Sequence, residues 1–143
     1  MHMTHFKQLL MAAGMLAVAA IGAQAQAPKY IFYFIGDGMG MGPVMAAQTY
    51  KRVVRADAEP LTMMQFPVVA WCQTWSASST TTDSAAAGTA LSTGTKTRNG
   101  MLGVAPDSTA VTSIAADLHN MGWGVGITTS VAADDATPGA FYA

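Results

Sequence analysis

Charged residues are scarce in this chain of 143 residues, in which Asp, Glu, Lys and Arg together make up 10%. The 7 Lys and Arg almost balance the 8 Asp and Glu, so the formal net charge is −1. Because proteins that bind along nucleic acid need many cationic side chains against phosphates, we expect no nucleic-acid-binding surface. Apolar residues make up 51% of the chain, which argues against an intrinsically disordered protein.

Cysteine is almost absent, since Cys72 is the single one and no disulfide can form within the chain. It follows the apolar run 68–71, and this setting favours burial of the thiol as a small apolar side chain. Pairing with a thiol outside this chain is the alternative for an exported protein.

No apolar run is long enough to span a bilayer. Leu9–Ala23 covers about 15 residues, and a transmembrane helix needs roughly 20. Lys7 precedes this run and Ala23-Gln24-Ala25 follows it, which is typical of a secretory signal peptide with its cleavage site. We therefore predict a signal peptide over residues 1–25, with a membrane anchor as the alternative. The protein is expected to be exported, periplasmic or extracellular, with no stable membrane anchor.

Apolar segments alternate with helical patterns along residues 26–143. Continuously apolar runs with aromatic and β-branched residues predict buried strands, since strands covered on both faces lack alternation. They are 29–35, 68–74 and 124–129. Helices are predicted over 43–52, from about 83 to 91, over 112–121, and from Pro138 onward with Thr137 as its cap. This order predicts an α/β fold with a mostly parallel central sheet flanked by helices.

The last predicted helix has barely begun when the chain stops at Ala143. A natural domain rarely ends inside an element. We therefore expect residues 26–143 to be the N-terminal part of a longer catalytic domain, with the sheet incomplete in this chain.

Polar clusters follow each predicted strand. Asp37 lies just after the first strand, Asp83-Ser84 opens the helix after the second, and Asp134-Asp135 with Thr137 follows the third. Since ligands of parallel sheets bind beyond the carboxyl ends of the strands, these distant segments are expected to converge on one site. Each cluster has a simpler interpretation, namely a turn for Asp37, a helix cap for Asp83-Ser84, and a solvated loop with a cap for the third cluster.

Other familiar motifs do not fit. A dinucleotide-binding pattern that starts at Gly36 needs glycine where Met41 stands, and no Gly-Lys pair marks a P-loop. A serine triad would have to use His119, which lies on a predicted amphipathic helix away from the strand ends and is expected at the surface.

Four segments have a distinctive residue order: Phe34–Gly40, Thr82–Ala90, Lys96–Gly100 with Leu102–Val104, and Asp135–Pro138. Taken in this order they closely resemble the alkaline phosphatase family. The resemblance extends over essentially all of residues 28–143.

The resemblance implies a role for individual residues. Asp37 matches an aspartate that bridges a magnesium ion and one of two zinc ions, and Ser84 matches the nucleophile whose oxygen binds zinc and becomes phosphorylated. Thr137 matches a hydroxyl ligand of magnesium, and Asp135 matches a position that supports magnesium through water. Asp83 matches a neighbour that helps to hold a phosphate-binding arginine.

The implied activity is hydrolysis of phosphate monoesters through a phosphoserine, with two Zn²⁺ and one Mg²⁺, and the complete protein is a possible homodimer. The family's zinc-binding histidines and phosphate-binding arginine come later in the chain, and no histidine follows His119 here. We therefore expect this segment alone to be inactive. The alternatives are a related phosphodiesterase or sulfatase-type hydrolase of the same fold, or a catalytically inactive truncated fragment. Ser84 lacks the following Pro and Arg of the sulfatase motif.

Overall fold

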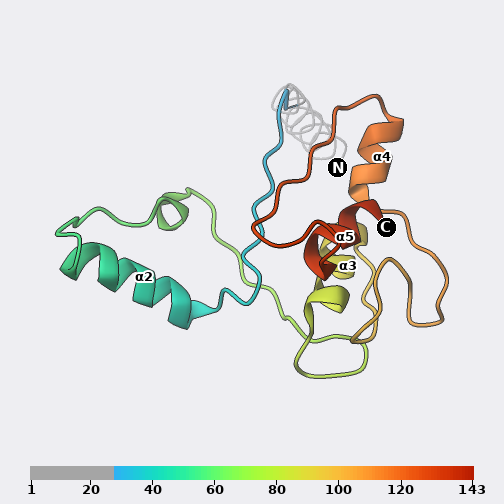
Figure 1. The fold of residues 1–143 in the computed structure, drawn as a ribbon, viewed down its shortest axis with the longest axis horizontal. Helices are drawn as coiled ribbons and strands as arrows, with labels where there is room; N and C mark the ends of the chain where they lie inside the picture. The colour runs from blue at the N-terminus through green and yellow to red at the C-terminus, as the bar shows by residue number, and fades with distance from the viewer. Residues whose placement is uncertain (1–27) are drawn as a thin grey trace, which may run out of the picture. The chain divides into compact units, whose positions relative to one another are not determined.

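The computed structural model describes residues 28–143, so the predicted signal peptide at 1–25 lies outside the described residues. Residues 28–35 and residues 36–143 belong to different compact units. Within 36–143 the elements are α2 (Met41–Val53), η1 (Thr62–Gln65), α3 (Ser84–Thr93), α4 (Ile114–Asn120) and α5 (Ala136–Tyr142) (Figure 1). No helix within 28–143 has both the length and the apolar character needed to cross a bilayer.

The predicted parallel sheet is not found in the described part of the chain. Segments 29–35, 68–74 and 124–129 form no ladder, and Figure 1 draws no strand. The β-bridge among residues 28–143 is an isolated antiparallel one between Val104 and Ala110. The prediction of an α/β fold with a mostly parallel sheet was therefore wrong.

The physical reason is that an apolar pattern indicates only a preference for strand conformation. A strand in a sheet also needs a second strand that pairs with its backbone N–H and C=O groups. Within the described residues none of the three segments forms a ladder, and large apolar side chains in them are exposed. Phe34 is 83% exposed and Trp71 is 85% exposed.

The predicted burial of Cys72 was also wrong, because its thiol is exposed and unpaired. Its apolar neighbours Val69 and Trp71 are exposed as well. The burial prediction assumed that segment 68–74 is covered on both faces, and it fails for the same reason as the sheet.

Helix α2 confirms the helix predicted over 43–52. It begins at Met41, which places Pro43 in the first turn, where the missing N–H costs no intrahelical hydrogen bond. Lys51 lies in its last turn, and its Nζ is 2.7 Å from Oδ2 of Asp57, which follows the helix. Hydrogen bonding from Lys51, with a smaller contribution from the backbone N–H of Glu59, lowers the pKa of the Asp57 carboxyl. Helix η1 was not predicted.

Helix α3 also follows its local signals. Asp83 is the N-cap, with its carboxylate accepting a hydrogen bond from the Ala86 N–H, and Gly94 ends the helix at φ +72°. The side chain of Ser84, the first residue of α3, is therefore not needed for capping.

Helix α4 lies within the predicted helix 112–121, and Gly122 follows it at φ +86°, as the C-terminal glycine signal predicts. The sequence predicts that Ile114, Ala115 and Leu118 share the apolar face of this helix. Ala115 is buried, whereas Ile114 is exposed. Helix α5 is present, but its cap is Asp135 and not Thr137, so the prediction of Thr137 as the cap was wrong.

Helices α3, α4 and α5 pack against one another around small residues. Ala86 and Ala140 are almost fully buried, and the Thr89 hydroxyl donates to Ala85 O and accepts from Gly103 N. The Ser113 hydroxyl donates to Phe141 O at 2.8 Å, which ties the start of α4 to α5. This packing holds the first residues of α3 and α5 in a fixed relation.

Gly88 is a point of close approach between α3 and α5, since a Cβ at this position would lie 3.0 Å from Ala140 Cβ. Gly88→Val should therefore destabilise the chain by about 1–3 kcal/mol through overpacking. Gly42 is the matched control, because it also lies in a helix and an added Cβ there meets nothing within 4 Å. Thermal unfolding of both variants tests this, and an equal melting temperature for the two would contradict the close packing.

Candidate active site

Asp37 lies in a tight turn directly after segment 29–35. Met39 N donates to Gly36 O at 3.2 Å, and Gly38 adopts φ +64°, a conformation that favours glycine. The simpler interpretation of Asp37 as a turn residue is therefore correct as far as the backbone is concerned. Its exposed carboxylate nevertheless makes two contacts with residues far away in the sequence.

The first contact is with Ser84, which is 47 positions away. Ser84 Oγ donates to the Asp37 carboxylate, at 2.9 Å from Oδ2 and 3.1 Å from Oδ1. Because Asp83 performs the capping of α3, the Ser84 hydroxyl is left to point at Asp37. The interpretation of Ser84 as only a helix cap is therefore wrong.

The second contact is with Thr137, which is 100 positions from Asp37. Thr137 Oγ1 donates to Asp37 Oδ2 at 3.0 Å. Because Asp135 caps α5, Thr137 lies in the first turn with its hydroxyl turned to this carboxylate. One carboxylate and two hydroxyls from three distant segments thus form a cluster, which we call the Asp37 cluster (Asp37, Ser84 and Thr137).

Asp135 is the N-cap of α5. Its Oδ1 accepts a hydrogen bond from Ala136 N at 2.8 Å, so the carboxylate is bound to its own helix and not to Asp37. Both Asp134 and Asp135 are exposed. The structure thus brings together three of the four predicted site residues, and a role for Asp135 in metal binding stays a prediction.

The loop at Asn99-Gly100 belongs to the surroundings of Ser84, and sequence reasoning gave it no role. Gly100 N donates to Asp83 Oδ2 at 2.6 Å, next to Ser84 in the chain. The Asn-Gly pair is a strong turn signal, and Gly100 indeed adopts φ +82°. That signal predicts the turn but not the residue that the turn contacts.

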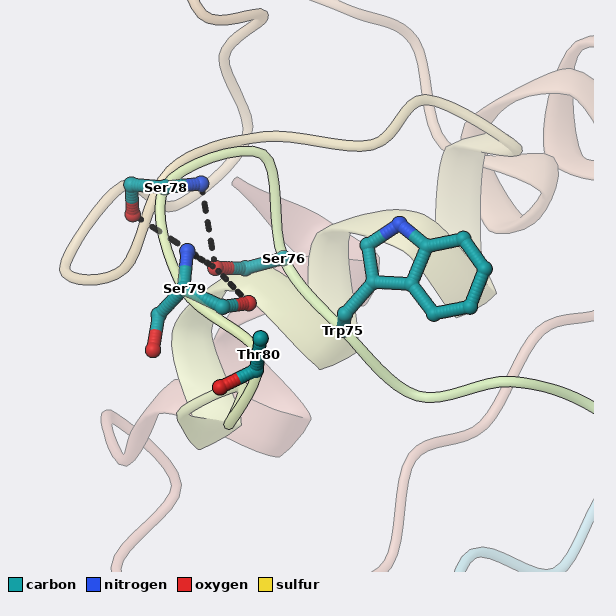
Figure 2. Close-up of a pocket in the computed structure, with 5 residues that line it drawn as sticks. All are labelled: Trp75, Ser76, Ser78, Ser79 and Thr80. Carbon is teal, nitrogen blue, oxygen red and sulfur yellow. Dashed lines mark hydrogen bonds between the residues drawn. The ribbon is translucent and has the colours of Figure 1, made fainter.

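A separate open pocket of about 430 Å³ is lined by Trp75, Ser76, Ser78, Ser79 and Thr80 (Figure 2). Lys96 Nζ lies 4.1 Å from the centre of the Trp75 ring. None of the residues of the Asp37 cluster lines this pocket.

A family model described as alkaline phosphatase matches residues 28–143. The chain belongs to the alkaline phosphatase family. It is 34% identical over 128 residues to the tissue-nonspecific alkaline phosphatase of Homo sapiens, which covers 80% of this chain and 24% of the relative. The Gallus gallus enzyme of the same name is also 34% identical, over 80% of this chain and 25% of the relative.

An alkaline phosphatase of Gadus morhua is 33% identical over 126 residues, which is 79% of this chain and 26% of the relative. The chain therefore spans about a quarter of the length of these curated relatives. No solved structure matches the chain.

Alkaline phosphatases depend on metal ions, so the donor atoms of the site can be compared with each metal. The Asp37 cluster offers a carboxylate and two hydroxyl oxygens, and hard oxygen ligands suit Mg²⁺. Zinc in proteins is usually held by several His, Cys, Asp or Glu side chains. Within residues 28–143, no three such side chains lie close enough to hold a metal, and His119 is exposed on α4. The cluster fits magnesium, whereas the described residues alone do not fit zinc.

Proposed function

We propose that this segment carries the nucleophile of an enzyme that hydrolyses phosphate monoesters through a phosphoserine at Ser84. The observation that carries the proposal is the contact of Ser84 Oγ, at the start of α3, with the Asp37 carboxylate at 2.9 Å. Thr137 contacts the same carboxylate oxygen. A hydroxyl held by a carboxylate at a helix N-terminus suits attack on a phosphoryl group, because helix N–H groups favour phosphate oxygens.

In the first step Ser84 Oγ forms a bond to phosphorus and the ester P–O bond breaks. The hydroxyl proton passes from Ser84 to water and the departing alkoxide takes up a proton from water, so that one proton moves in net from Ser84 to the free alcohol. In the second step water attacks the phosphoserine, which releases inorganic phosphate and restores the Ser84 hydroxyl. Asp37 orients the hydroxyl at the start, because its carboxylate accepts the Ser84 hydrogen and fixes the direction of the oxygen lone pairs.

Asp37 and Thr137 are proposed to hold one Mg²⁺, with Asp135 supporting it through water. Magnesium in this place would supply positive charge that favours the ionised form of Ser84 Oγ. The two Zn²⁺ implied by the resemblance require ligands from outside residues 28–143, and no step above depends on them. The segment alone is accordingly proposed to be inactive.

The substrate class can be tested with three chromogenic esters: 4-nitrophenyl phosphate, bis(4-nitrophenyl) phosphate and 4-nitrophenyl sulfate. The complete natural chain that carries this segment should hydrolyse the phosphate monoester with a kcat/KM at least about 100-fold above those of the other two esters. Faster turnover of the diester or the sulfate would favour a related hydrolase instead.

A further inference from the structure

We propose that Asn99 is a positioning residue for Ser84, a role that rests on the proposed function of Ser84 as nucleophile. The side-chain amide of Asn99 makes two hydrogen bonds to the backbone just before Ser84. Its Oδ1 accepts from Asp83 N at 3.3 Å, and its Nδ2 donates to Thr81 O at 3.0 Å. A planar amide offers an acceptor and a donor side by side, which is what a backbone N–H and a C=O two residues apart require.

The contact is reciprocal. The Asp83 side chain accepts from Gly100 N at 2.6 Å through Oδ2 and from Ala86 N at 2.9 Å through Oδ1. The side chain of Asn99 thus holds the backbone before Ser84, while the side chain of Asp83 holds the backbone after Asn99. Together these four hydrogen bonds fix where α3 begins, and Ser84 is its first residue.

Asn99 is itself held by the serine loop, residues 76–79. Its backbone N–H donates to Ser78 Oγ at 2.9 Å. Figure 2 shows how this loop folds on itself, because Ser78 N and Ser79 N both donate to Ser76 Oγ, at 3.3 and 3.0 Å. Ala77 N also donates to Thr97 O at 2.8 Å, and Thr97 is fully buried. The loop therefore holds the backbone of Asn99, while the side chain of Asn99 holds the backbone before Ser84.

These contacts join Asn99 to the residues around the nucleophile and not to the Asp37 cluster. Its partners are Ser78, Thr81 and Asp83, whereas Asp37 is contacted by Ser84 and Thr137. A displacement of about 1 Å at a reacting atom can cost about 100-fold in rate. Loss of Asn99 is therefore expected to slow phosphorylation of Ser84 while leaving the affinity for phosphate largely intact.

The test compares Asn99→Ala and Asn99→Asp with Asn120→Ala in the complete natural chain. Asn120 is exposed at the end of α4 and serves as the matched control. Three quantities are measured: kcat for 4-nitrophenyl phosphate, the inhibition constant of inorganic phosphate, and the thermal midpoint. Asn99→Ala should lower kcat about tenfold or more, with the phosphate inhibition constant within about twofold of wild type. Asn99→Asp keeps the acceptor for Asp83 N but sets a carboxylate oxygen against Thr81 O, so it should also lower kcat, and Asn120→Ala should match the wild type.

A kcat for both Asn99 variants equal to that of Asn120→Ala would overturn the proposal. So would a phosphate inhibition constant that rises as much as kcat falls, because that result indicates general damage to the site. If Asn99→Ala does not fold, the same comparison with Asn99→Asp decides. Ser84→Ala separates the two proposals: continued phosphoenzyme formation in that variant refutes Ser84 as nucleophile, whereas its loss together with a normal Asn99→Ala refutes only the positioning role.

Discussion

Ser84→Ala should lower the turnover of a phosphate monoester by at least about a thousandfold in the complete natural chain, because removal of a catalytic nucleophile costs rates of this order or more. The substitution removes the oxygen that contacts Asp37 but leaves the cap of α3, which Asp83 supplies. We therefore expect the variant to fold normally. A much weaker hydrolysis by water can persist in it.

Ser130→Ala is the matched control for this measurement. Ser130 is exposed in the loop between α4 and α5, and it lies outside the Asp37 cluster. This control should retain wild-type turnover. Turnover of Ser84→Ala within a few-fold of the control would contradict the role of Ser84 as nucleophile.

Asp37→Asn should have the second largest effect. Asparagine preserves the shape of the side chain and one acceptor oxygen, but it removes the negative charge that both Ser84 and Thr137 face. A neutral amide is a weaker ligand for a hard cation. The Mg²⁺ concentration for half-maximal activity should therefore rise by about 10–100-fold or more. Substitution of residues that only support metal ligands already lowers metal affinity by about this factor.

The measurement is a magnesium titration of activity after removal of bound metal by a chelator. Asp117→Asn is the control, because Asp117 is an exposed aspartate on α4. An unchanged magnesium requirement for Asp37→Asn would show that Asp37 does not bind the ion.

Helices α2, α3, α4 and α5 could be predicted from the sequence because their signals are local. Asp83 before α3, Gly94 after it and Pro43 in the first turn of α2 act within a few residues of the boundary they set. The sheet could not be predicted in this way, because pairing of segments 29–35, 68–74 and 124–129 depends on partners far away in the chain. Their apolar pattern led to a fold class that residues 28–143 do not show.

The contacts of Asp37 with Ser84 and Thr137 were expected from the sequence, but the structural reason given for them was wrong. The prediction relied on the carboxyl ends of parallel strands, whereas the structure achieves the contact through a glycine turn and the first turns of α3 and α5. Asn99 belongs to a segment that carries the resemblance but was given no role, because its contacts are with backbone groups 16 and 18 positions away, which no local pattern encodes. The cluster itself is observed, and the catalytic and metal-binding roles of its members stay predictions.

The most direct test of the central claim is to find the residue that carries phosphate during turnover. The complete natural chain is mixed with a phosphate monoester, quenched in acid and digested, and the phosphorylated peptide is sequenced by mass spectrometry. We predict phosphate on Ser84 in the wild type and none on this peptide in Ser84→Ala. Phosphate on another residue of an enzyme that is turning over, or an unchanged amount of phosphoenzyme in Ser84→Ala, would contradict the account.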